Sequence, residues 1–235
     1  MKKAVVDSRI PRPCAERLSA LGYGLIAMPV FPALATPVSS HPDMILFFAD
    51  NTVFCHKDYF DIAKDELEEI AGCGYDIILS DEKISKDYPS DILFNALRLG
   101  NKIYCKADAA SKLILDFAQE RSLEIRKVKQ GYSKCSVCTV GEQAAITADL
   151  SLCRAMREDG IDVLLISAGG VVLQGYDTGF IGGCSGDDGD NVYFSGNILL
   201  HPDGERISEF CKKHGKTAVS LSDDLLTDVG TIFFI

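Results

Sequence analysis

The sequence has 235 residues, contains no tryptophan and has no apolar run of the roughly 18 residues that a membrane-spanning helix requires. Its first seven residues start basic and turn polar after three apolar residues. The apolar core of a secretory signal needs about 7–15 apolar residues at this place. We therefore expect an intracellular, cytoplasmic protein with no membrane partner.

The basic residues form no stripe or cluster, and the formal net charge is −10. This pattern argues against nucleic acid or an anionic membrane as the main partner. A small cationic ligand and a basic protein partner both stay open. The composition, 47% hydrophobic and 25% charged, predicts a folded chain with a substantial core.

Two common ligand motifs are absent. The chain has nine cysteines but a single C-x-x-C, formed by Cys135 and Cys138, and no second pair to complete a zinc site. On a strand these two thiols would point to opposite faces. The glycine-rich residues 182–186 are followed by a turn and not by a helix, which disfavours a phosphate-binding loop. We expect free thiols, no metal and no cofactor.

An internal repeat organises the chain. Five segments share a pattern and are expected to be strands: residues 42–47, 90–95, 134–139, 178–183 and 227–232. Their second residues, Asp43, Asp91, Cys135, Gly179 and Asp228, are 48, 44, 44 and 49 residues apart. A short turn, a second strand rich in β-branched and aromatic residues, an amphipathic helix and a third strand follow each of the first four segments.

The fifth unit is split between the two ends of the sequence. Residues 227–235 supply its first strand, and residues 3–6, 13–21 and 23–28 supply the rest. The sequence therefore predicts one α/β domain, a five-bladed propeller with helices outside. Its blades cover approximately residues 41–88, 89–131, 132–176, 177–225, and 226–235 with 1–40. A doubly wound sheet also alternates strands and helices, but it predicts no fixed period and no hairpin in each unit.

The five-unit ring resembles the pentein fold of the guanidino-group-modifying enzymes. That superfamily includes arginine and agmatine deiminases, dimethylarginine hydrolase and amidinotransferases. The local sequence is most similar to that of a family of short proteins with this fold and no assigned function. The segments that carry the likeness are residues 131–136 (GYSKCS), 175–186 (GYDTGFIGGCSG), 196–197 (GN), 201–203 (HPD) and 221–223 (LSD).

The resemblance implies a cysteine nucleophile, a histidine and carboxylates that hold a guanidinium. In the family the nucleophile generally lies close to the C-terminus, whereas residues 227–235 contain no cysteine and no histidine. Non-catalytic penteins also exist, such as the ribosome anti-association factor, and the fold by itself does not assign a reaction. Binding of a small ligand or of a protein or ribosomal partner is the alternative.

The repeat places Asp43, Asp91, Asp228 and Cys135 at matched positions around one axis. Buried unpaired carboxylates are costly, and a guanidinium with its planar donors would offset that cost. We expect Cys135 to be the nucleophile, with Lys134 favouring its thiolate. Alternatively, Cys135 is a small buried residue of the core, and the aspartates cap the turns at which the strands begin.

His41 is the expected general acid and base, acting with Asp43, although a turn residue before Pro42 is the other reading. The expected substrate contacts are Asp91, Asp228, Lys134, Asn95, Thr178, Gly183 and Cys184. Cys184 is a second candidate nucleophile. The expected activity is that of a cysteine-dependent hydrolase or amidinotransferase acting on a small guanidino or amidino compound. The oligomeric state stays open.

Overall fold

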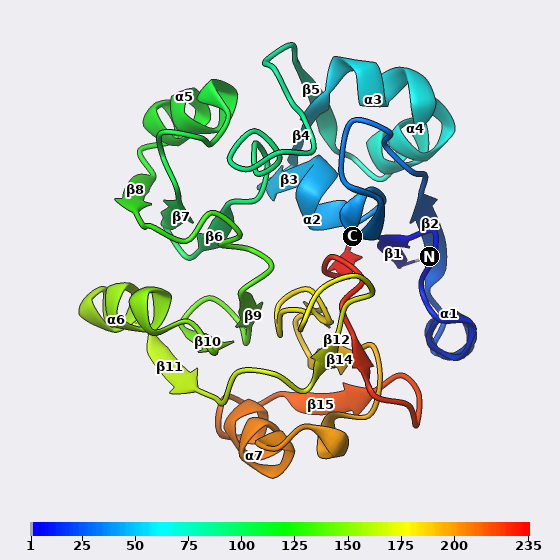
Figure 1. The fold of residues 1–235 in the computed structure, drawn as a ribbon, viewed down its shortest axis with the longest axis vertical. Helices are drawn as coiled ribbons and strands as arrows, with labels where there is room; N and C mark the ends of the chain where they lie inside the picture. The colour runs from blue at the N-terminus through cyan, green and yellow to red at the C-terminus, as the bar shows by residue number, and fades with distance from the viewer. Residues whose placement is uncertain (1) are drawn as a thin grey trace.

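A computed structural model describes residues 2–235 of the chain. Five three-stranded sheets stand around a central axis, and most of the helices lie at the periphery (Figure 1). The overall architecture is therefore mixed α/β. No helix among residues 2–235 is long and apolar enough to cross a membrane.

Each sheet has the same strand order, with the second strand of the unit in the middle. The sheets, each from its inner strand outward, are β3 (Leu46–Ala49), β4 (Thr52–His56) and β5 (Asp76–Ser80); β6 (Leu97–Leu99), β7 (Lys102–Cys105) and β8 (Glu124–Lys127); β9 (Val137–Thr139), β10 (Ala144–Thr147) and β11 (Asp162–Leu165); β13 (Ser185–Asp187), β14 (Asn191–Phe194) and β15 (Thr217–Ser220); and β17 (Phe233–Phe234), β1 (Lys3–Asp7) and β2 (Gly24–Met28). Every middle strand runs antiparallel to the inner strand and parallel to the outer one.

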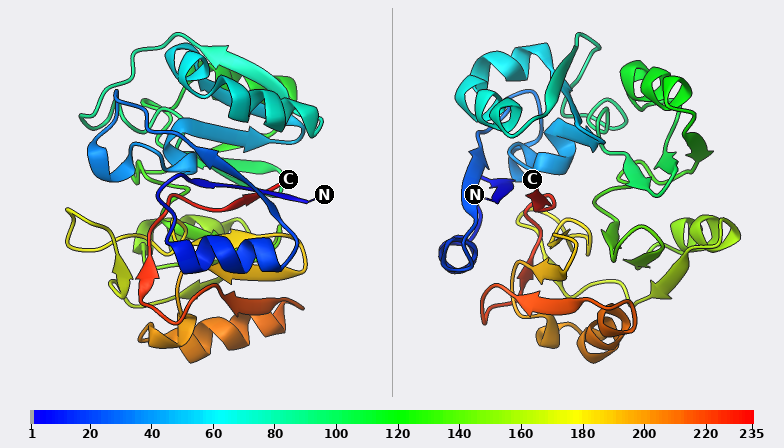
Figure 2. Two further views of the ribbon diagram at one scale, coloured as in Figure 1. Left: turned by 90° about the vertical axis from the view of Figure 1, so that its right-hand side faces the viewer. Right: turned by 180° about the vertical axis from the view of Figure 1, so that it is seen from behind.

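The two ends of the chain share one sheet, as the split fifth unit predicted. Strand β1 pairs antiparallel with β17, with Ala4 opposite Phe234, and the two termini lie close together (Figure 2). A further two-stranded sheet joins β12 (Val171–Val172) to β16 (Leu226–Thr227). This sheet connects the loop before residues 178–183 to the segment that carries Asp228.

Helices connect the middle and outer strands. They are α1 (Arg12–Ala20), α3 (Lys57–Ile62), α4 (Lys64–Gly72), α5 (Lys112–Glu120), α6 (Leu150–Glu158) and α7 (Gly204–Lys213). A short 3-10 helix, η2 (Ile198–Leu200), precedes α7, and another, η1 (Thr36–Val38), lies between β2 and β3. In α6 the Asp149 carboxylate caps the helix by accepting from the N–H groups of Ser151 and Leu152. Cys14, Cys153 and Cys211 are buried on α1, α6 and α7, as the helical periodicity predicted.

The five repeated segments were predicted to be the inner strands, and this was wrong for most of their residues, since only residues 46–47 and 137–139 lie on inner strands. Residues 42–45 form a short helix, α2 (Pro42–Ile45), because Pro42 suits the first turn of a helix and cannot donate to a sheet. At four of the segments the backbone instead makes a tight turn. The turns begin at His41, Ile92, Lys134 and Gly182, and in each the backbone carbonyl of the first residue accepts from the N–H of the residue three positions later. The inner strands begin only after these turns.

The turns also correct the expected equivalence between units. When the units are aligned on these turns, Cys135 is the second residue of its turn and corresponds to Pro42 and Gly183, not to Asp43 and Gly179. Cys138, which lies on β9, is buried like Cys135, although the two thiols join different apolar clusters. The segments that precede the inner strands therefore form irregular backbone around the axis, and this backbone carries the candidate site.

Candidate functional site

Cys135 lies at the axis, 4% exposed, and Asn95 fixes its position. The Asn95 Nδ2 donates to the Cys135 Sγ at 2.8 Å, and the Asn95 Oδ1 accepts from the backbone N–H groups of Lys134 at 2.9 Å and Cys135 at 3.3 Å. Nδ2 also donates to the backbone carbonyl of Asp43 at 3.0 Å. One amide side chain thus ties together three units of the repeat.

Asp43 is fully buried beside this thiol. Its Oδ2 accepts from the hydroxyl of Thr231 at 2.7 Å, while Oδ1 has no hydrogen-bond partner. Thr231 was not expected in the site from the sequence. It precedes β17 and brings the C-terminal segment against the first unit.

His41 is held between two carboxylates. Its Nε2 lies 3.6 Å from Asp7 Oδ2, and its Nδ1 lies 3.6 Å from Asp228 Oδ1. Gly230 permits this packing, because a Cβ at that position would come within 2.1 Å of the Cβ of His41. Nδ1 has no hydrogen-bond partner, so one nitrogen of a buried imidazole is left open.

Asp228 is the most constrained carboxylate of the group. Its two oxygens accept from the N–H groups of Phe180 at 2.9 Å and Gly230 at 3.1 Å. Burial raises the pKa of Asp228 to about 6, the charge of Asp43 adds to the rise, and His41 opposes it. A Cβ on Gly183 would come within 2.0 Å of Asp228 Oδ1, so glycine is required there.

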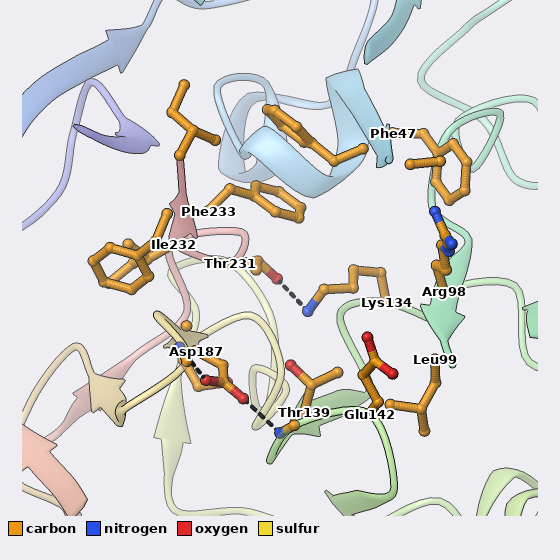
Figure 3. A pocket seen from close by; sticks show the side chains of 18 of the residues that line it. Phe47, Arg98, Leu99, Lys134, Thr139, Glu142, Asp187, Thr231, Ile232 and Phe233 are labelled. Carbon is orange, nitrogen blue, oxygen red and sulfur yellow. Dashed lines mark hydrogen bonds between the residues drawn. The ribbon is translucent and has the colours of Figure 1, made fainter. Parts of the chain in front are cut away.

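The electrostatics hold Cys135 as a thiol in the ligand-free protein. Burial raises the pKa of Cys135 well above its ordinary value, and the charges of Asp43 and Asp228 raise it further. Lys134, expected to favour the thiolate, points its Nζ toward Thr231 Oγ1 at 3.3 Å and the backbone carbonyl of Val137 at 3.5 Å (Figure 3). Its charge is thus directed toward the far end of the axis.

Asp91 and Thr178 form no hydrogen bond with the side chains of Cys135, Asp43, His41 or Asp228. Asp91 accepts from the hydroxyl of Tyr132 at 2.6 Å, and burial raises its pKa. Thr178 donates to the carbonyl of Val171 at 3.1 Å. Tyr132 and Phe180, whose ring centroids are 6.0 Å apart, pack against the apolar cluster that contains Cys135.

Cys184 is directed into apolar surroundings. It is fully buried in a cluster of apolar side chains, its thiol donates to the carbonyl of Ile181 at 3.3 Å, and burial raises its pKa well above the ordinary value. Gly183, by contrast, touches the site directly, because its N–H donates to the carbonyl of Cys135 at 3.0 Å. Among the two thiols, only Cys135 lies beside Asn95 and Asp43.

Sequence reasoning missed Asp7, Thr231 and the aromatic side chains of Tyr132 and Phe180. Asp7 is 2% exposed at the end of the buried strand β1, and it accepts from the hydroxyl of Ser40 and the guanidinium of Arg9. The sequence did offer one indication of Asp7, because this charged residue directly follows the apolar residues 4–6. Nothing in the local sequence marks Thr231.

The unsatisfied polar atoms concentrate around this axis. Within residues 2–235, four buried side-chain nitrogen or oxygen atoms lack a hydrogen-bond partner: His41 Nδ1, Asp43 Oδ1, Asp91 Oδ1 and Ser136 Oγ. All four belong to segments that enter the inner strands, and Ser136 follows Cys135 directly. Unpaired buried polar atoms are uncommon and costly, and they mark this region as one suited to a polar ligand.

Two cavities adjoin the group. The smaller cavity, of about 170 Å³, is lined by residues that include Ser136, Thr178, Gly179 and Phe180. The larger, about 480 Å³, lies at the hairpin turns, and Lys134 and Thr231 line it (Figure 3). Among residues 2–235, no three His, Cys, Asp or Glu side chains are grouped so as to hold a metal ion.

The sequence matches, over residues 5–233, a family model described as "Family of unknown function (DUF6873)". The chain belongs to this family. A search of curated proteins gave no match.

Solved structures with the pentein fold are similar over most of their length. A dimethylarginine dimethylaminohydrolase from Pseudomonas aeruginosa, complexed with citrulline, has a TM-score of 0.57 at 9% identity, covering 94% of this chain and 91% of the other. An amidinotransferase from Microseira wollei, of the saxitoxin pathway, has a TM-score of 0.53 at 13% identity, covering 88% and 72%. The chain therefore has the fold of the guanidino-group-modifying enzymes.

Proposed function

We propose that this protein binds a small guanidino or amidino cation at the axis and that Cys135 attacks it, as in a hydrolase or an amidinotransferase. The observation that carries this proposal is the open Asp43 Oδ1, fully buried beside the Cys135 thiol. We also propose that the five sheets are the blades of one propeller and form a single domain. The active centre then lies where the irregular segments meet.

A cation supplies what this centre lacks. Asp43 and Asp228 are buried close enough for each charge to act on Cys135, and the charge of Asp43 also raises the pKa of Asp228. A guanidinium donates several N–H groups in one plane and pairs with carboxylates through charge-assisted hydrogen bonds. Tyr132 and Phe180 offer aromatic faces for the same planar group.

The cation would also activate the nucleophile. The two carboxylate charges that hold the pKa of Cys135 high would be neutralised by the bound ligand. The pKa of the thiol would then fall, because an opposite charge favours the ionised form. Asn95 Nδ2 already donates to Sγ and would stabilise the thiolate.

The reaction begins when the Cys135 thiolate attacks the central carbon of the amidine and forms a C–S bond. The C–N bond to the leaving amine then breaks, and the amine takes a proton from His41. Water, deprotonated by His41, attacks the same carbon and releases Cys135 with a urea-type product. In a transferase an acceptor amine takes the place of that water. Asp7 and Asp228, on either side of His41, would orient the imidazole.

The second candidate function is ligand binding without chemistry. The observation that favours it is the raised pKa of Cys135, which keeps the ligand-free protein unreactive. In that case Asp43 and Asp228 are needed for affinity, and Cys135 is a small buried residue of the pocket wall. A small ligand or a protein partner bearing an exposed guanidinium would suit this function.

Calorimetric titration of agmatine, arginine and methylguanidine tests the cation site. We expect saturable binding of at least one of the three, and at least about tenfold weaker binding by Asp43→Asn, which corresponds to about 1.4 kcal/mol. Asp203→Asn, at the start of α7, is the matched control and should leave affinity unchanged. Equal affinity of the wild type and Asp43→Asn, or no binding of any of the three cations, would overturn the proposal.

A further inference from the structure

The cavity of about 480 Å³ lies at the end of the axis opposite the segments that carry Cys135 and Asp43. Those segments precede the inner strands, whereas Asp50, Glu142 and Asp187, which line the cavity, lie in or beside the hairpin turns that follow these strands. Its volume falls within the range of small-molecule sites, roughly 300–1,000 Å³. The chemistry proposed for Cys135 makes no use of this space.

Lys134 reaches into the cavity without a carboxylate partner. Its Nζ contacts Thr231 Oγ1 at 3.3 Å and the carbonyl of Val137 at 3.5 Å, and it stands 5.7 Å from the ring centroid of Phe233. Among residues 2–235, no carboxylate oxygen lies within ion-pair distance of it. Burial lowers the pKa of Lys134, because a charged amine is disfavoured away from water, and the charge of Asp43 opposes the shift.

The other two cations that line the cavity are already paired. Arg98 forms an ion pair with Asp50, and Lys216 forms one with Asp187 at 2.7 Å. Lys134 is thus the cation available to a ligand (Figure 3). The exposed Glu142 at the rim has no ion-pair partner among the described residues, and its charge disfavours ligands with more than one negative charge.

Aromatic side chains form one wall of the same cavity. Phe48 and Phe233 have ring centroids 4.6 Å apart, and Phe47 and Phe234 also line the cavity. These rings and Lys134 are complementary to a molecule with a flat apolar part and one carboxylate. A phosphate group would fit less well, because it carries more charge and lacks the apolar part.

We propose that the hairpin-end cavity is a second binding site, which takes a small aromatic carboxylate. The carboxylate pairs with the Lys134 ammonium, and the ring packs against Phe48 and Phe233. Binding at this site needs no chemistry at Cys135, so it can be tested whether or not the protein is an enzyme.

Calorimetric titration of phenylacetate and its neutral analogue phenylacetamide tests the site. We expect phenylacetate to bind saturably below about 10 mM and phenylacetamide to bind at least about tenfold more weakly. Lys134→Met should lower the affinity for phenylacetate at least about tenfold, since it removes the charge and keeps most of the volume. Lys129→Met, an equal change of charge at an exposed residue that lines neither cavity, should leave the affinity unchanged.

Glu142→Gln is the second variant, because its exposed turn position makes it safe for folding. Removal of this carboxylate should strengthen phenylacetate binding about two- to fivefold. Three results would each overturn the proposal: no saturable binding of phenylacetate, equal affinity of the wild type and a folded Lys134→Met, or an affinity unchanged by Glu142→Gln.

Discussion

The side-chain amide of Asn95 donates to the Sγ of Cys135 at 2.8 Å and accepts from the backbone N–H of the same residue at 3.3 Å. Asn95 therefore fixes both the thiol and the peptide that carries it. Its further bond to the Asp43 carbonyl joins the carboxylate to the same network. In this account Asn95 is a positioning residue, and it donates to the sulfur in both the thiol and the thiolate form.

Asn95→Asp should shift the pH profile of Cys135 alkylation to higher pH. The new carboxylate keeps the acceptor for the Lys134 and Cys135 N–H groups, but it replaces a donor to Sγ with a negative charge. We expect a shift of about one unit or more in the apparent pKa, measured with iodoacetamide. Asn51→Asp, on an exposed turn, is the control. An unshifted profile would show that Asn95 does not act on the sulfur.

Asp43→Asn should change the reactivity of Cys135 in opposite directions toward two reagents. Loss of the carboxylate charge lowers the pKa of Cys135, so neutral iodoacetamide should react about three- to tenfold faster. The cationic reagent 2-chloroacetamidine should react more slowly, because its binding partner is lost. Rates measured by mass spectrometry separate the two effects. The same direction of change for both reagents would contradict the role given to Asp43.

The affinity for a guanidino ligand should rise with pH through about 6. Burial raises the pKa of Asp228 from 3.8 to about 6, so below that pH its carboxyl is protonated and neutral. A cation prefers the carboxylate, and affinity should therefore fall as the pH is lowered through this value. Titrations at several pH values between about 5 and 8 measure it. Asp228→Asn should bind weakly with little pH dependence in this range.

Gly183→Ala should destabilise the protein by about 1–3 kcal/mol, because its Cβ would lie 2.0 Å from Asp228 Oδ1. Chemical denaturation measures the change. Gly72→Ala is the matched control, since it ends α4 and its Cβ would meet nothing within 4 Å. That variant should be neutral or slightly stabilising. A tolerated Gly183→Ala would mean that the packing around Asp228 is loose.

The repeat in the sequence was enough to predict the middle and outer strand of each sheet and the split closure, because strands, turns and helices each leave a local pattern. The pairing of β1 with β17 followed from that pattern. The structure of the irregular segments did not follow from it. Their turns depend on Pro42 and on glycines such as Gly182, whose effect comes from close packing between distant segments.

The candidate site was predictable in composition but not in geometry. Cys135, Asp43 and Asp228 do gather near the axis, whereas Asp91 bonds to Tyr132 and Lys134 turns toward the hairpins. The expected alternation of a strand failed because these residues lie in turns. Thr231, which bonds to Asp43 from 188 residues away, has no local signature at all.

The most direct test of Cys135 as a nucleophile is the site of modification by 2-chloroacetamidine among the nine cysteines. We predict preferential labelling of Cys135, loss of that label in Cys135→Ser and protection by a guanidino ligand. The buried Cys184 should stay unlabelled under the same conditions. Labelling of Cys135 no faster than that of the other thiols, or unaffected by Asp43→Asn, would contradict a nucleophile at this position.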